Sequence, residues 1–346
     1  MTDRRAHLLE RLSRLPRFSL ARLPTPLDDL PRLARALDRP RILVKRDDLT
    51  GLAFGGNKTR ELDFIVGEAL ARGANVFVAG GGAGQSNHAV QCAAAANRAG
   101  MKPILVLHRS RADEPQGNLL LSRLLGAEIH FVDTDGVDGA INRRTALEGV
   151  MRRIADDHRG RGLTPYVLPS SFHPLAAAAY AGCALELAGQ LDALGLPAAR
   201  VYLASAGATQ VGLALGARHI GAPFRVVGIA YTADTTGLRD RMLGLARETG
   251  ELLGLDTRLE DGDLTNESFA GPGYGVVTPE GREAIRLLAE TEGLFLDPVY
   301  TGKGMAGLID HVRRGIVPRD EAIVFLHTGG LPALFSYNRE MVPATP

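Results

Sequence analysis

Two kinds of segment follow one another along the chain. Short runs dominated by Val, Ile, Leu and Ala predict buried strands, and longer segments whose apolar residues recur at helical spacing predict helices. Their alternation is typical of an α/β protein built on parallel strands. The predicted strands are residues 42–45, 75–79, 103–107, 128–132, 166–168, 201–204, 225–230 and 322–326. The predicted helices are residues 60–72, 87–99, 118–125, 146–157, 174–194, 209–216, 235–254, 279–292 and 303–314.

The N-terminal region fits an ordinary first helix. Leu8 and Leu12 lie at helical spacing in an Arg-rich segment, and acidic residues interrupt the basic ones, which favours an amphipathic helix over a transit peptide. The longest apolar runs, such as residues 175–181, are shorter than the roughly 20 residues that cross a bilayer, so we expect no membrane partner. Linker-like stretches fall at residues 159–164 and 261–275.

Composition narrows the class of protein. A length of 346 residues corresponds to about two domains. The 40 basic and 39 acidic residues nearly cancel, which argues against a nucleic-acid partner held by an overall basic excess. Cys92 and Cys183 cannot build a disulfide framework, no His/Cys cluster has metal-ligand spacing, and no signal peptide is visible. We therefore expect two buried free thiols, a cytoplasmic location and no metal.

Lysine is scarce. Of the 40 basic residues 36 are Arg, and the four lysines are Lys45, Lys58, Lys102 and Lys303. Lysine can lose its proton and act as an amine nucleophile, whereas arginine cannot. Lys58 follows Gly55-Gly56-Asn57 and opens a helix, whose dipole disfavours a protonated amine. The scarcity alone marks Lys45 and Lys303 equally.

Glycine is abundant, with 41 residues, and two Gly-rich turns each join a strand to a helix. The first is Gly80-Gly81-Gly82-Ala83-Gly84, followed by Gln85 and the donors Ser86, Asn87 and His88. Successive backbone N–H groups at such a turn bind a carboxylate or a phosphate. The glycine spacing does not match a dinucleotide motif. The simpler interpretation is a tight turn with Ser86 as the helix N-cap.

The second turn has the composition of a phosphate site. It comprises Ser205, Ala206, Gly207, Ala208, Thr209 and Gln210. Its small residues let a ligand approach the backbone closely, and Ser205 and Thr209 offer hydroxyls. No lysine follows as in a nucleoside-triphosphate loop. An ordinary strand-to-helix turn is the alternative.

Three further segments carry candidate site residues. They are residues 271–275 with Tyr274, residues 297–304 with Tyr300 and Thr301, and the strand end His327-Thr328-Gly329-Gly330. A reactive amine, two anion-binding turns and a hydroxyl at a strand end would together serve a phosphorylated aldehyde cofactor and an amino-acid carboxylate, which is the chemistry of pyridoxal 5′-phosphate.

These motifs in this order resemble the D-cysteine desulfhydrase and 1-aminocyclopropane-1-carboxylate (ACC) deaminase family of fold type II pyridoxal-phosphate enzymes. The resemblance runs from about residue 24 to residue 337. Its markers are residues 23–27 (LPTPL), 45–48 (KRDD), 55–60 (GGNKTR), 85–88 (QSNH), 273–275 (GYG), 297–303 (DPVYTGK) and 327–330 (HTGG).

The resemblance implies a fold and an assembly. The fold is α/β, with twisted, mostly parallel sheets flanked by helices and the cofactor in the cleft between two domains. The larger domain would comprise residues 1–59 and 173–346, and residues 60–172 would form a smaller inserted domain. A homodimer is expected as well.

The resemblance also implies roles for single residues. Lys58 matches the lysine that carries the cofactor and is the expected base, and Asn57 matches the residue that bonds the ring oxygen. The other matched sets are Ser205, Ala206, Gly207, Ala208 and Thr209 for the phosphate; Thr301 and Thr328 beside the pyridine ring; Ser86, Asn87 and His88 for the substrate carboxylate, with Ser86 also in acid–base catalysis; and Tyr274 and Tyr300 as catalytic tyrosines lining the site.

Two loops depart from the family pattern. Ala208 stands where relatives usually have Gly, and its methyl group disfavours a positive φ. Residues 170–173 (SSFH) stand where relatives often have Gly-Gly-Ser.

The expected activity is a carbon–sulfur lyase reaction. Family ACC deaminases tend to carry Glu and Leu at the positions of Thr301 and Thr328, so this chain resembles the desulfhydrases. We expect β-elimination of D-cysteine to pyruvate, ammonia and sulfide. ACC deamination and L-cysteate sulfo-lysis are alternatives within the family. A non-catalytic binding homologue and a nicotinamide oxidoreductase are alternatives of other classes.

Overall fold

The structure is a computed structural model. It describes residues 3–82, 86–108, 115–133, 140–168, 170, 172–205, 207–232, 235 and 237–342, without the side chains of 140–144.

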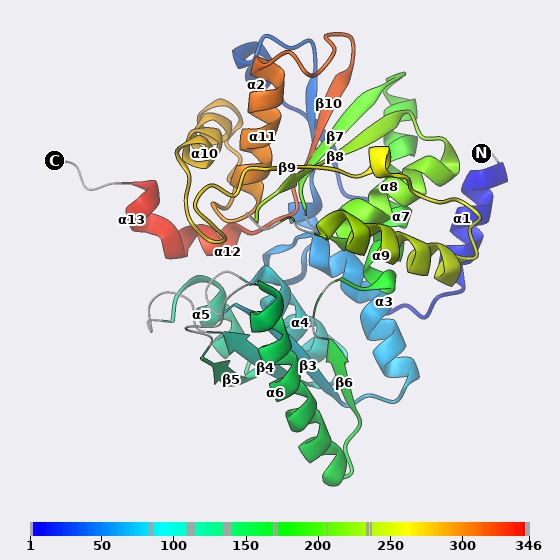
Figure 1. Cartoon of the computed structure of the whole chain (residues 1–346), viewed down its shortest axis with the longest axis vertical. Coiled ribbons are helices and arrows are strands. Elements are labelled where there is room, and N and C mark those ends of the chain that lie inside the picture. The colour runs from blue at the N-terminus through cyan, green and yellow to red at the C-terminus, as the bar shows by residue number, and fades with distance from the viewer. Residues whose placement is uncertain are drawn as a thin grey trace.

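Two sheets organise the molecule and lie in the upper and lower halves of Figure 1. The strands are β1 Leu27–Asp29, β2 Ile42–Lys45, β3 Val76–Gly82, β4 Lys102–His108, β5 Glu128–Val132, β6 Pro165–Leu168, β7 Ala199–Ala204, β8 Phe224–Ala230, β9 Thr265–Ser268 and β10 Ala322–Leu326. The upper sheet has the order β1-β2-β10-β7-β8-β9 and the lower sheet the order β5-β4-β3-β6. Every described strand pair is parallel except β1–β2.

Helices cover the faces of both sheets (Figure 1). Their bounds are α1 Asp3–Ser13, α2 Pro31–Ala36, α3 Asn57–Ala71, α4 Asn87–Arg98, α5 Gly117–Leu124, α6 Ala140–Gly160, α7 Pro174–Ala193, α8 Ala208–Ile220, α9 Leu238–Leu253, α10 Pro279–Glu292, α11 Thr301–Arg313, α12 Leu331–Leu334 and α13 Asn338–Met341. Short 3-10 turns are η1 Asp47–Leu49, η2 Leu52–Phe54, η3 Asp261–Asp263 and η4 Phe335–Tyr337.

The period-2 pattern of the strands explains why helices lie on both faces of the six-stranded sheet. In β2, Ile42 and Val44 belong to a core shared with α2, α10 and α11, whereas Leu43 belongs to the core shared with α7 and α8. Successive strand side chains point to opposite faces, so an unbroken apolar strand must be covered twice.

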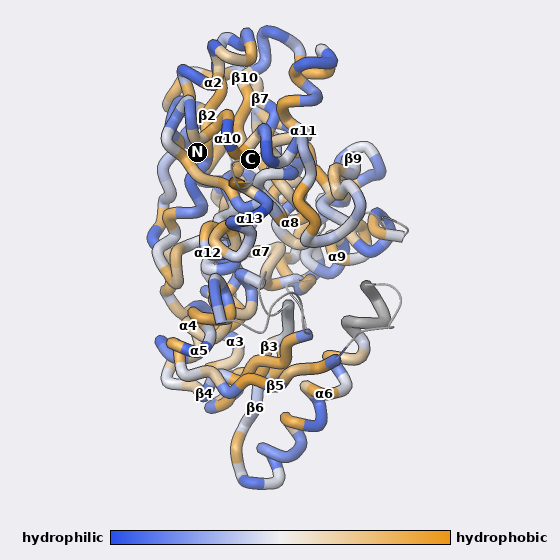
Figure 2. The backbone as a smooth tube through the Cα atoms, turned by 90° about the vertical axis from the view of Figure 1, so that its left-hand side faces the viewer, coloured by the Kyte–Doolittle hydropathy of each residue, from blue (hydrophilic) through white to orange (hydrophobic). Residues whose placement is uncertain are grey.

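The four-stranded sheet follows the same rule. Val76 and Val78 of β3 pack with Met151 of α6, and Phe77 and Ala79 belong to the core that includes α4. In Figure 2 the tube of β3 is mostly orange, while that of α6 changes between orange and blue along its length. That alternation is expected of a helix with one buried face.

The predicted α/β class with mostly parallel sheets is confirmed, and β2, β5, β10 and α10 have the predicted bounds. Some predicted boundaries are wrong. Helix α3 begins at Asn57, before the predicted range of 60–72 and one residue before Lys58, which we expected to open a helix; α11 begins at Thr301, inside a motif that we assigned to a loop. The linker-like stretch 261–275 contains β9, which pairs with β8.

The six-stranded sheet takes its strands from both ends of the chain, and the four-stranded sheet takes them from the segment between β3 and β6. This arrangement supports the proposed domain bounds of 1–59 with 173–346 and 60–172, which stay a prediction.

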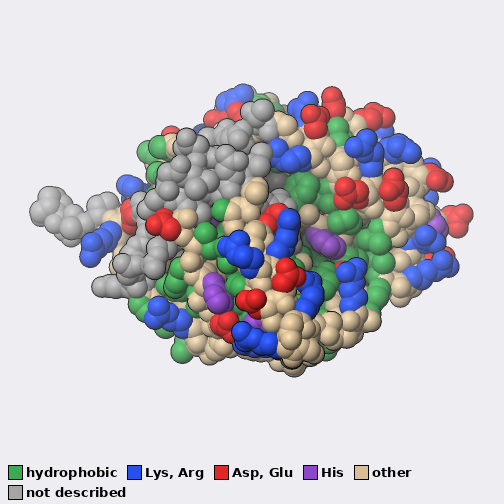
Figure 3. Space-filling view, turned by 60° about the horizontal axis from the view of Figure 1, so that its bottom comes forward, with side chains coloured by type: hydrophobic (Ala, Val, Ile, Leu, Met, Phe, Trp, Pro, Cys, Tyr) green, Lys and Arg blue, Asp and Glu red, His purple; other side chains and the backbone are tan. Residues whose placement is uncertain are grey.

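Three expectations drawn from composition can be compared with the structure. Cys92 and Cys183 are buried free thiols, as predicted. Among the described residues, no helix combines the length and apolarity that crossing a membrane requires. On the face drawn in Figure 3, basic and acidic side chains are interspersed, as the balanced charge implies.

Candidate active site

The carboxyl edge of the six-stranded sheet brings several of the predicted site segments together. Strands β2, β10, β7 and β8 are parallel neighbours, so their carboxyl ends share one edge, where ligands bind in open α/β sheets. The segments that leave this edge include Thr328 after β10, Ser205 after β7 and Tyr231 after β8. The loop after β2 leads to Lys58.

Close backbone contact places the start of α3 against the end of β10. The Asn57 N–H donates to the Thr328 carbonyl over 3.1 Å. Gly56 has a φ of 128°, and a Cβ there would lie 2.9 Å from the Thr328 oxygen and 2.8 Å from Nε2 of Gln91. Only glycine tolerates both the conformation and the contact, which explains the Gly-Gly before Asn57.

The structure separates Lys58 from the other three lysines. Lys45 is fully buried against Glu186, Gln190 and the Thr25 carbonyl. Lys303 is fully buried and donates to the carbonyls of Ala270 and Gly273 over 2.7 and 3.1 Å. Burial lowers the pKa of Lys303 to about 8.

Lys102 lies on the surface and pairs with Glu128. Lys58, with 17% of its side chain exposed, lies at the carboxyl edge of the six-stranded sheet, where several predicted site segments meet. The structure therefore resolves an ambiguity that composition left open.

Lys58 has an acidic neighbour that we did not predict. Its Nζ lies 3.0 and 3.2 Å from the two carboxylate oxygens of Glu61. Oε1 of Glu61 also accepts from the Thr209 hydroxyl over 3.1 Å, and the Thr209 hydroxyl in turn accepts from Nδ2 of Asn57 over 2.9 Å. Thus α3 and α8 meet through a polar cluster of Asn57, Lys58, Glu61 and Thr209. The signal was available, because residues three apart share a helix face.

The turn between β7 and α8 is compatible with an anion. The Ser205 hydroxyl accepts from the Gly207 N–H over 3.3 Å, and α8 begins at Ala208. Its first N–H groups therefore lie where a helix binds anions. Ala208 has no positive φ, so its methyl group causes no backbone strain, and the concern raised by the missing glycine does not arise. Ala206 lies outside the described residues.

The first Gly-rich segment differs from the predicted tight turn. Gly80, Gly81 and Gly82 belong to β3 and pair with β4. A Cβ on Gly81 would lie 2.3 Å from the hydroxyl of Ser86, so this glycine permits close packing. Residues 83–85 lie outside the described residues. The simpler interpretation of Ser86 is confirmed, since its hydroxyl caps α4 by accepting from the Ala89 N–H.

The two residues after Ser86 have partners of their own. The Asn87 side-chain oxygen accepts from Nδ2 of Asn118 over 3.0 Å. The ring nitrogens of His88 lie 3.6 and 3.7 Å from the Cys92 sulfur. Burial, with a contribution from the charge of Lys58, lowers the pKa of His88 to about 3. His88 is therefore a neutral donor or acceptor at physiological pH.

Three tyrosines form a cluster, one more than predicted. The hydroxyls of Tyr274 and Tyr300 are hydrogen-bonded to each other. The Tyr231 ring packs edge-on against Tyr300 at 4.8 Å between centroids and lies 6.1 Å from Tyr274. Burial, followed by the charge of Glu61, raises the pKa of Tyr231 to about 12. Tyr231 thus extends the pair of tyrosines to a cluster of three, a position foreseeable from its place after a parallel strand.

Asp297 holds the loop that carries Tyr300 and Thr301. Its buried carboxylate accepts from the backbone N–H groups of Val299, Tyr300 and Thr301 and from the Thr301 hydroxyl. That hydroxyl also accepts from the Asp297 N–H. Thr301 is fully buried, so its hydroxyl is committed within the loop, and a place beside a pyridine nitrogen stays a prediction.

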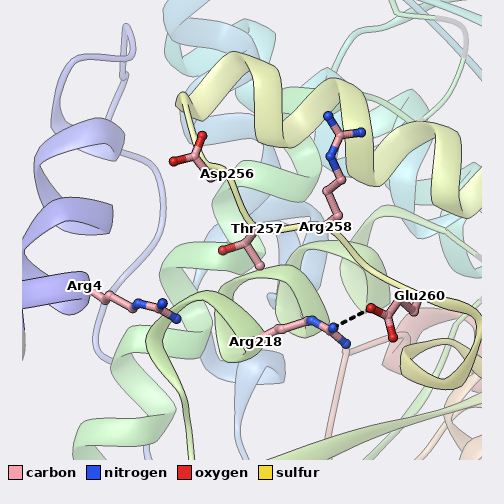
Figure 4. Close-up of a pocket in the computed structure, with 6 residues that line it drawn as sticks. All are labelled: Arg4, Arg218, Asp256, Thr257, Arg258 and Glu260. Carbon is pink, nitrogen blue, oxygen red and sulfur yellow. Dashed lines mark hydrogen bonds and ion pairs between the residues drawn. The ribbon is translucent and has the colours of Figure 1, made fainter.

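Two other clusters of charged side chains lie outside this site. A surface pocket of about 440 Å³ is lined by Arg4, Arg218, Asp256, Thr257, Arg258 and Glu260 (Figure 4). Arg218 pairs there with Glu260 and also with Asp263. Glu267 of β9 and Asp310 and His311 of α11 offer possible metal-ligand atoms within 4.8 Å of one another, but Arg314 pairs with both carboxylates.

The sequence is similar to those of known proteins. A family described as pyridoxal-phosphate dependent enzyme matches residues 18–329. A 1-aminocyclopropane-1-carboxylate deaminase of Methylobacterium nodulans is 39% identical, covering 94% of this chain and 98% of its own. A D-cysteine desulfhydrase of Salmonella choleraesuis is also 39% identical, covering 95% and 98%.

A solved structure, described as an ACC deaminase homologue, has the same architecture. It is 33% identical, covers 99% of each chain, and superposes with a TM-score of 0.88.

Proposed function

Since the chain belongs to the family of pyridoxal-phosphate-dependent enzymes, we propose that its reaction is the β-elimination of D-cysteine to pyruvate, ammonia and sulfide. Its likeness to ACC deaminases and D-cysteine desulfhydrases over nearly their full length makes it a pyridoxal-phosphate-dependent lyase of that family. Relatives of both names are equally similar, so the substrate must be argued from the site.

The observation that carries the choice is the pair Thr301 and Thr328. The family resemblance associates Glu and Leu at these positions with ACC deamination. Here Thr301 is neutral, and its hydroxyl is engaged with Asp297. A neutral partner at the pyridine ring favours an unprotonated ring nitrogen. Elimination tolerates such a ring, because the electron pair left at Cα forms the Cα=Cβ double bond while sulfide leaves with the electron pair of the Cβ–S bond.

The residues present fit the cofactor. Lys58 is the lysine whose amine lies at the convergence of strand ends, while Lys45 and Lys303 are fixed in buried contacts. Ser205, Gly207, Ala208 and Thr209, together with Ala206, would hold the phosphate at the N-terminus of α8. When bound, pyridoxal 5′-phosphate supplies an aldehyde that links to amines and a ring that stabilises negative charge at Cα.

Side chains of this protein bind the substrate and transfer protons. The amine of Lys58 accepts the Cα proton of the substrate. The N-terminus of α4, with Ser86, Asn87 and His88, holds the substrate carboxylate, and a neutral His88 contributes a hydrogen bond. Tyr274 and Tyr300, linked through their hydroxyls, line the substrate side and assist proton transfer to the departing sulfur.

Lys303 positions the loop of Tyr274 and takes no part in the reaction itself. It holds the carbonyls of Ala270 and Gly273, and so fixes the loop that carries Tyr274. A cytoplasmic location and a homodimer remain part of the proposal.

ACC deamination is the second candidate, because the deaminase of Methylobacterium nodulans and the desulfhydrase of Salmonella choleraesuis match this chain with the same 39% identity. A panel of D-cysteine, L-cysteine, β-chloro-D-alanine, L-cysteate and ACC, assayed for pyruvate or 2-oxobutyrate, decides between the two. We expect pyruvate from D-cysteine and β-chloro-D-alanine. Faster release of 2-oxobutyrate from ACC would overturn the assignment, and sulfite from L-cysteate would redirect it to a sulfo-lyase.

Lys58→Ala tests the central residue. We expect elimination to be abolished and borohydride to leave no cofactor fixed to the protein. Lys102→Ala is the control, because this exposed lysine pairs only at the surface with Glu128, and it should behave as wild type. Unchanged turnover in Lys58→Ala would remove Lys58 from its role, and binding without turnover in the wild type would indicate a non-catalytic homologue.

A further inference from the structure

A buried carboxylate lies between the reactive amine and the phosphate turn. Glu61 is one helical turn beyond Lys58 on α3, and its side chain is 1% exposed. Both of its oxygens lie within 3.2 Å of Lys58 Nζ. The oxygen Oε1 also accepts the hydroxyl proton of Thr209 over 3.1 Å. The carboxylate therefore contacts the amine and a phosphate-turn residue at the same time.

This position conflicts with a phosphorylated aldehyde unless a proton moves. A phosphate at the β7–α8 turn would lie near the negative charge of Glu61, and like charges in a buried site repel strongly. The single proton of the Thr209 hydroxyl is directed at Glu61 and not at the turn. In addition, Lys58 must be a neutral amine to attack a carbonyl carbon.

The groups that face the pair from other elements are neutral at physiological pH. On α4, His88 has a pKa of about 3, and burial raises the pKa of the Cys92 thiol. After β8, Tyr231 has a pKa of about 12. On the far side of α3, Arg60 pairs with Asp47 and Glu186. Among these described groups, none facing the pair exchanges protons readily near neutral pH.

We propose that Glu61 accepts the proton of Lys58 when the cofactor binds. One N–H bond of Lys58 breaks with its electron pair staying on Nζ, and an O–H bond forms on Glu61. The amine becomes a nucleophile, and the neutral carboxylic acid no longer repels the phosphate. When Nζ forms a neutral double bond to the aldehyde carbon, its two remaining hydrogens leave with the aldehyde oxygen as water. Glu61 keeps the third proton, so the pocket releases none to the solvent.

Burial favours this outcome independently. It raises the pKa of Glu61, outweighing the opposing effects of Lys58 and Thr209. In this role Glu61 holds the proton that Lys58 gives up. The inference rests on the proposed role of Lys58 as the cofactor-bearing lysine.

Proton release during cofactor loading tests the inference. Apo protein is mixed with pyridoxal 5′-phosphate in weakly buffered solution with an indicator dye, over a pH series from mildly acidic to mildly alkaline. Wild type, Glu61→Gln and the matched control Glu68→Gln are compared. Glu68 lies on the same helix and contacts Tyr166 and Arg72 instead. Loading of Lys58 is quantified by borohydride fixation and peptide mass.

In Glu61→Gln the carboxylate that we propose as the acceptor is removed, and the lysine proton leaves for the solvent. We expect this variant to release one more proton per loaded Lys58 than wild type, over the pH range in which its lysine is protonated. Within that range its loading constant should rise about tenfold per pH unit relative to wild type. Glu68→Gln should match wild type. Equal proton release by wild type and Glu61→Gln at every pH would overturn the inference.

A second measurement needs no variant that could misfold. Infrared difference spectra of wild type should gain the C=O band of a protonated carboxyl on loading, shifted in deuterium oxide; its absence would also overturn the inference. The two proposals fail separately. If wild type fixes no cofactor at Lys58, the role of Lys58 is wrong. If it does so without the proton effects, only the role of Glu61 is wrong.

Discussion

His88 shows how burial fixes the charge of a single side chain. Its pKa of about 3 lies below the ordinary value of 6.5, because burial and the neighbouring charge of Lys58 both disfavour the imidazolium. His88 is therefore neutral wherever the enzyme is expected to work. It can hold a substrate carboxylate by a hydrogen bond but not as a cation.

The variant His88→Gln tests this assignment. We expect a higher KM, because one carboxylate contact weakens, while the acid limb of the pH profile of kcat/KM keeps its midpoint. His130→Gln on β5, where His130 pairs with Glu128, is the control. Loss of an ionisation near 6.5 in His88→Gln alone would show that His88 titrates and contradict the assignment.

The same residue affects stability in a defined direction. Between pH 6.5 and about 3 an unfolded His88 binds a proton and a folded one does not. Stability therefore falls as the pH falls through this window. In His88→Gln the melting temperature should decline less steeply there than in wild type.

At the scale of single residues, the motifs name side chains that the structure brings together, but they do not name the side chains that only folding adds to them. Lys58, Asn57 and Thr209 were predicted and do lie together. Glu61 was missed because no motif names it, although its spacing of three from Lys58 at the start of a predicted helix places the two side chains on one face. Tyr231 was missed because no glycine or lysine marks its segment.

At the scale of elements, the start of α11 depends on one carboxylate. Asp297 accepts four hydrogen bonds from the residues that begin this helix. Its negative charge also lies at the N-terminal end of the helix, where the dipole is favourable to it. The loop that presents Tyr300 is therefore ordered by a buried acceptor.

Asp297→Asn replaces an acceptor oxygen by a donor. We expect the free energy of unfolding to fall by about 2–4 kcal/mol, since hydrogen bonds to a buried charge are lost. Turnover should fall as well, because Tyr300 loses its support. Urea unfolding and steady-state kinetics measure the two effects. Asp310→Asn is the control on the same helix, where an exposed pair with Arg314 should contribute no more than about 1 kcal/mol. Equal losses in both variants would contradict the role of Asp297.

Elements were predictable in proportion to their apolar character. Strands β2, β5 and β10 are dominated by apolar residues and were predicted with their observed bounds. Strand β9, with the sequence TNES, was missed because it has no apolar residue. It is a strand because β8 offers it backbone hydrogen bonds, and such pairing between distant segments leaves no local pattern.

At the scale of the whole molecule, a buried ionic network ties together segments far apart in the chain. Arg60 of α3 pairs with Asp47 after β2 and with Glu186 of α7. Glu186 also pairs with Lys45 of β2, and the Thr25 hydroxyl donates to Asp47. Because Arg60 is two residues after Lys58, this network also holds the helix turn that carries the Lys58 amine.

Glu186 is the member whose pH dependence can be stated. Burial would raise its pKa, but Arg60 and Lys45 outweigh burial and lower it to about 2, against an ordinary 4.5. The stability that this ionised carboxylate contributes is thus fully present above pH 4.5 and is lost as the pH falls towards 2.

Glu186→Gln should therefore destabilise the protein most at neutral pH. We expect the free energy of unfolding to drop by about 2–4 kcal/mol, below the full cost of a broken buried pair because Arg60 keeps Asp47. The difference from wild type should shrink as the pH falls from 4.5 towards 2, because protonation removes the same charge from wild type. Urea unfolding at several pH values measures it. Glu290→Gln, in an exposed pair with Arg286, should change stability by less than about 1 kcal/mol. A loss that is independent of pH, or no larger than that of Glu290→Gln, would mean that the network does not join these segments through the charge of Glu186.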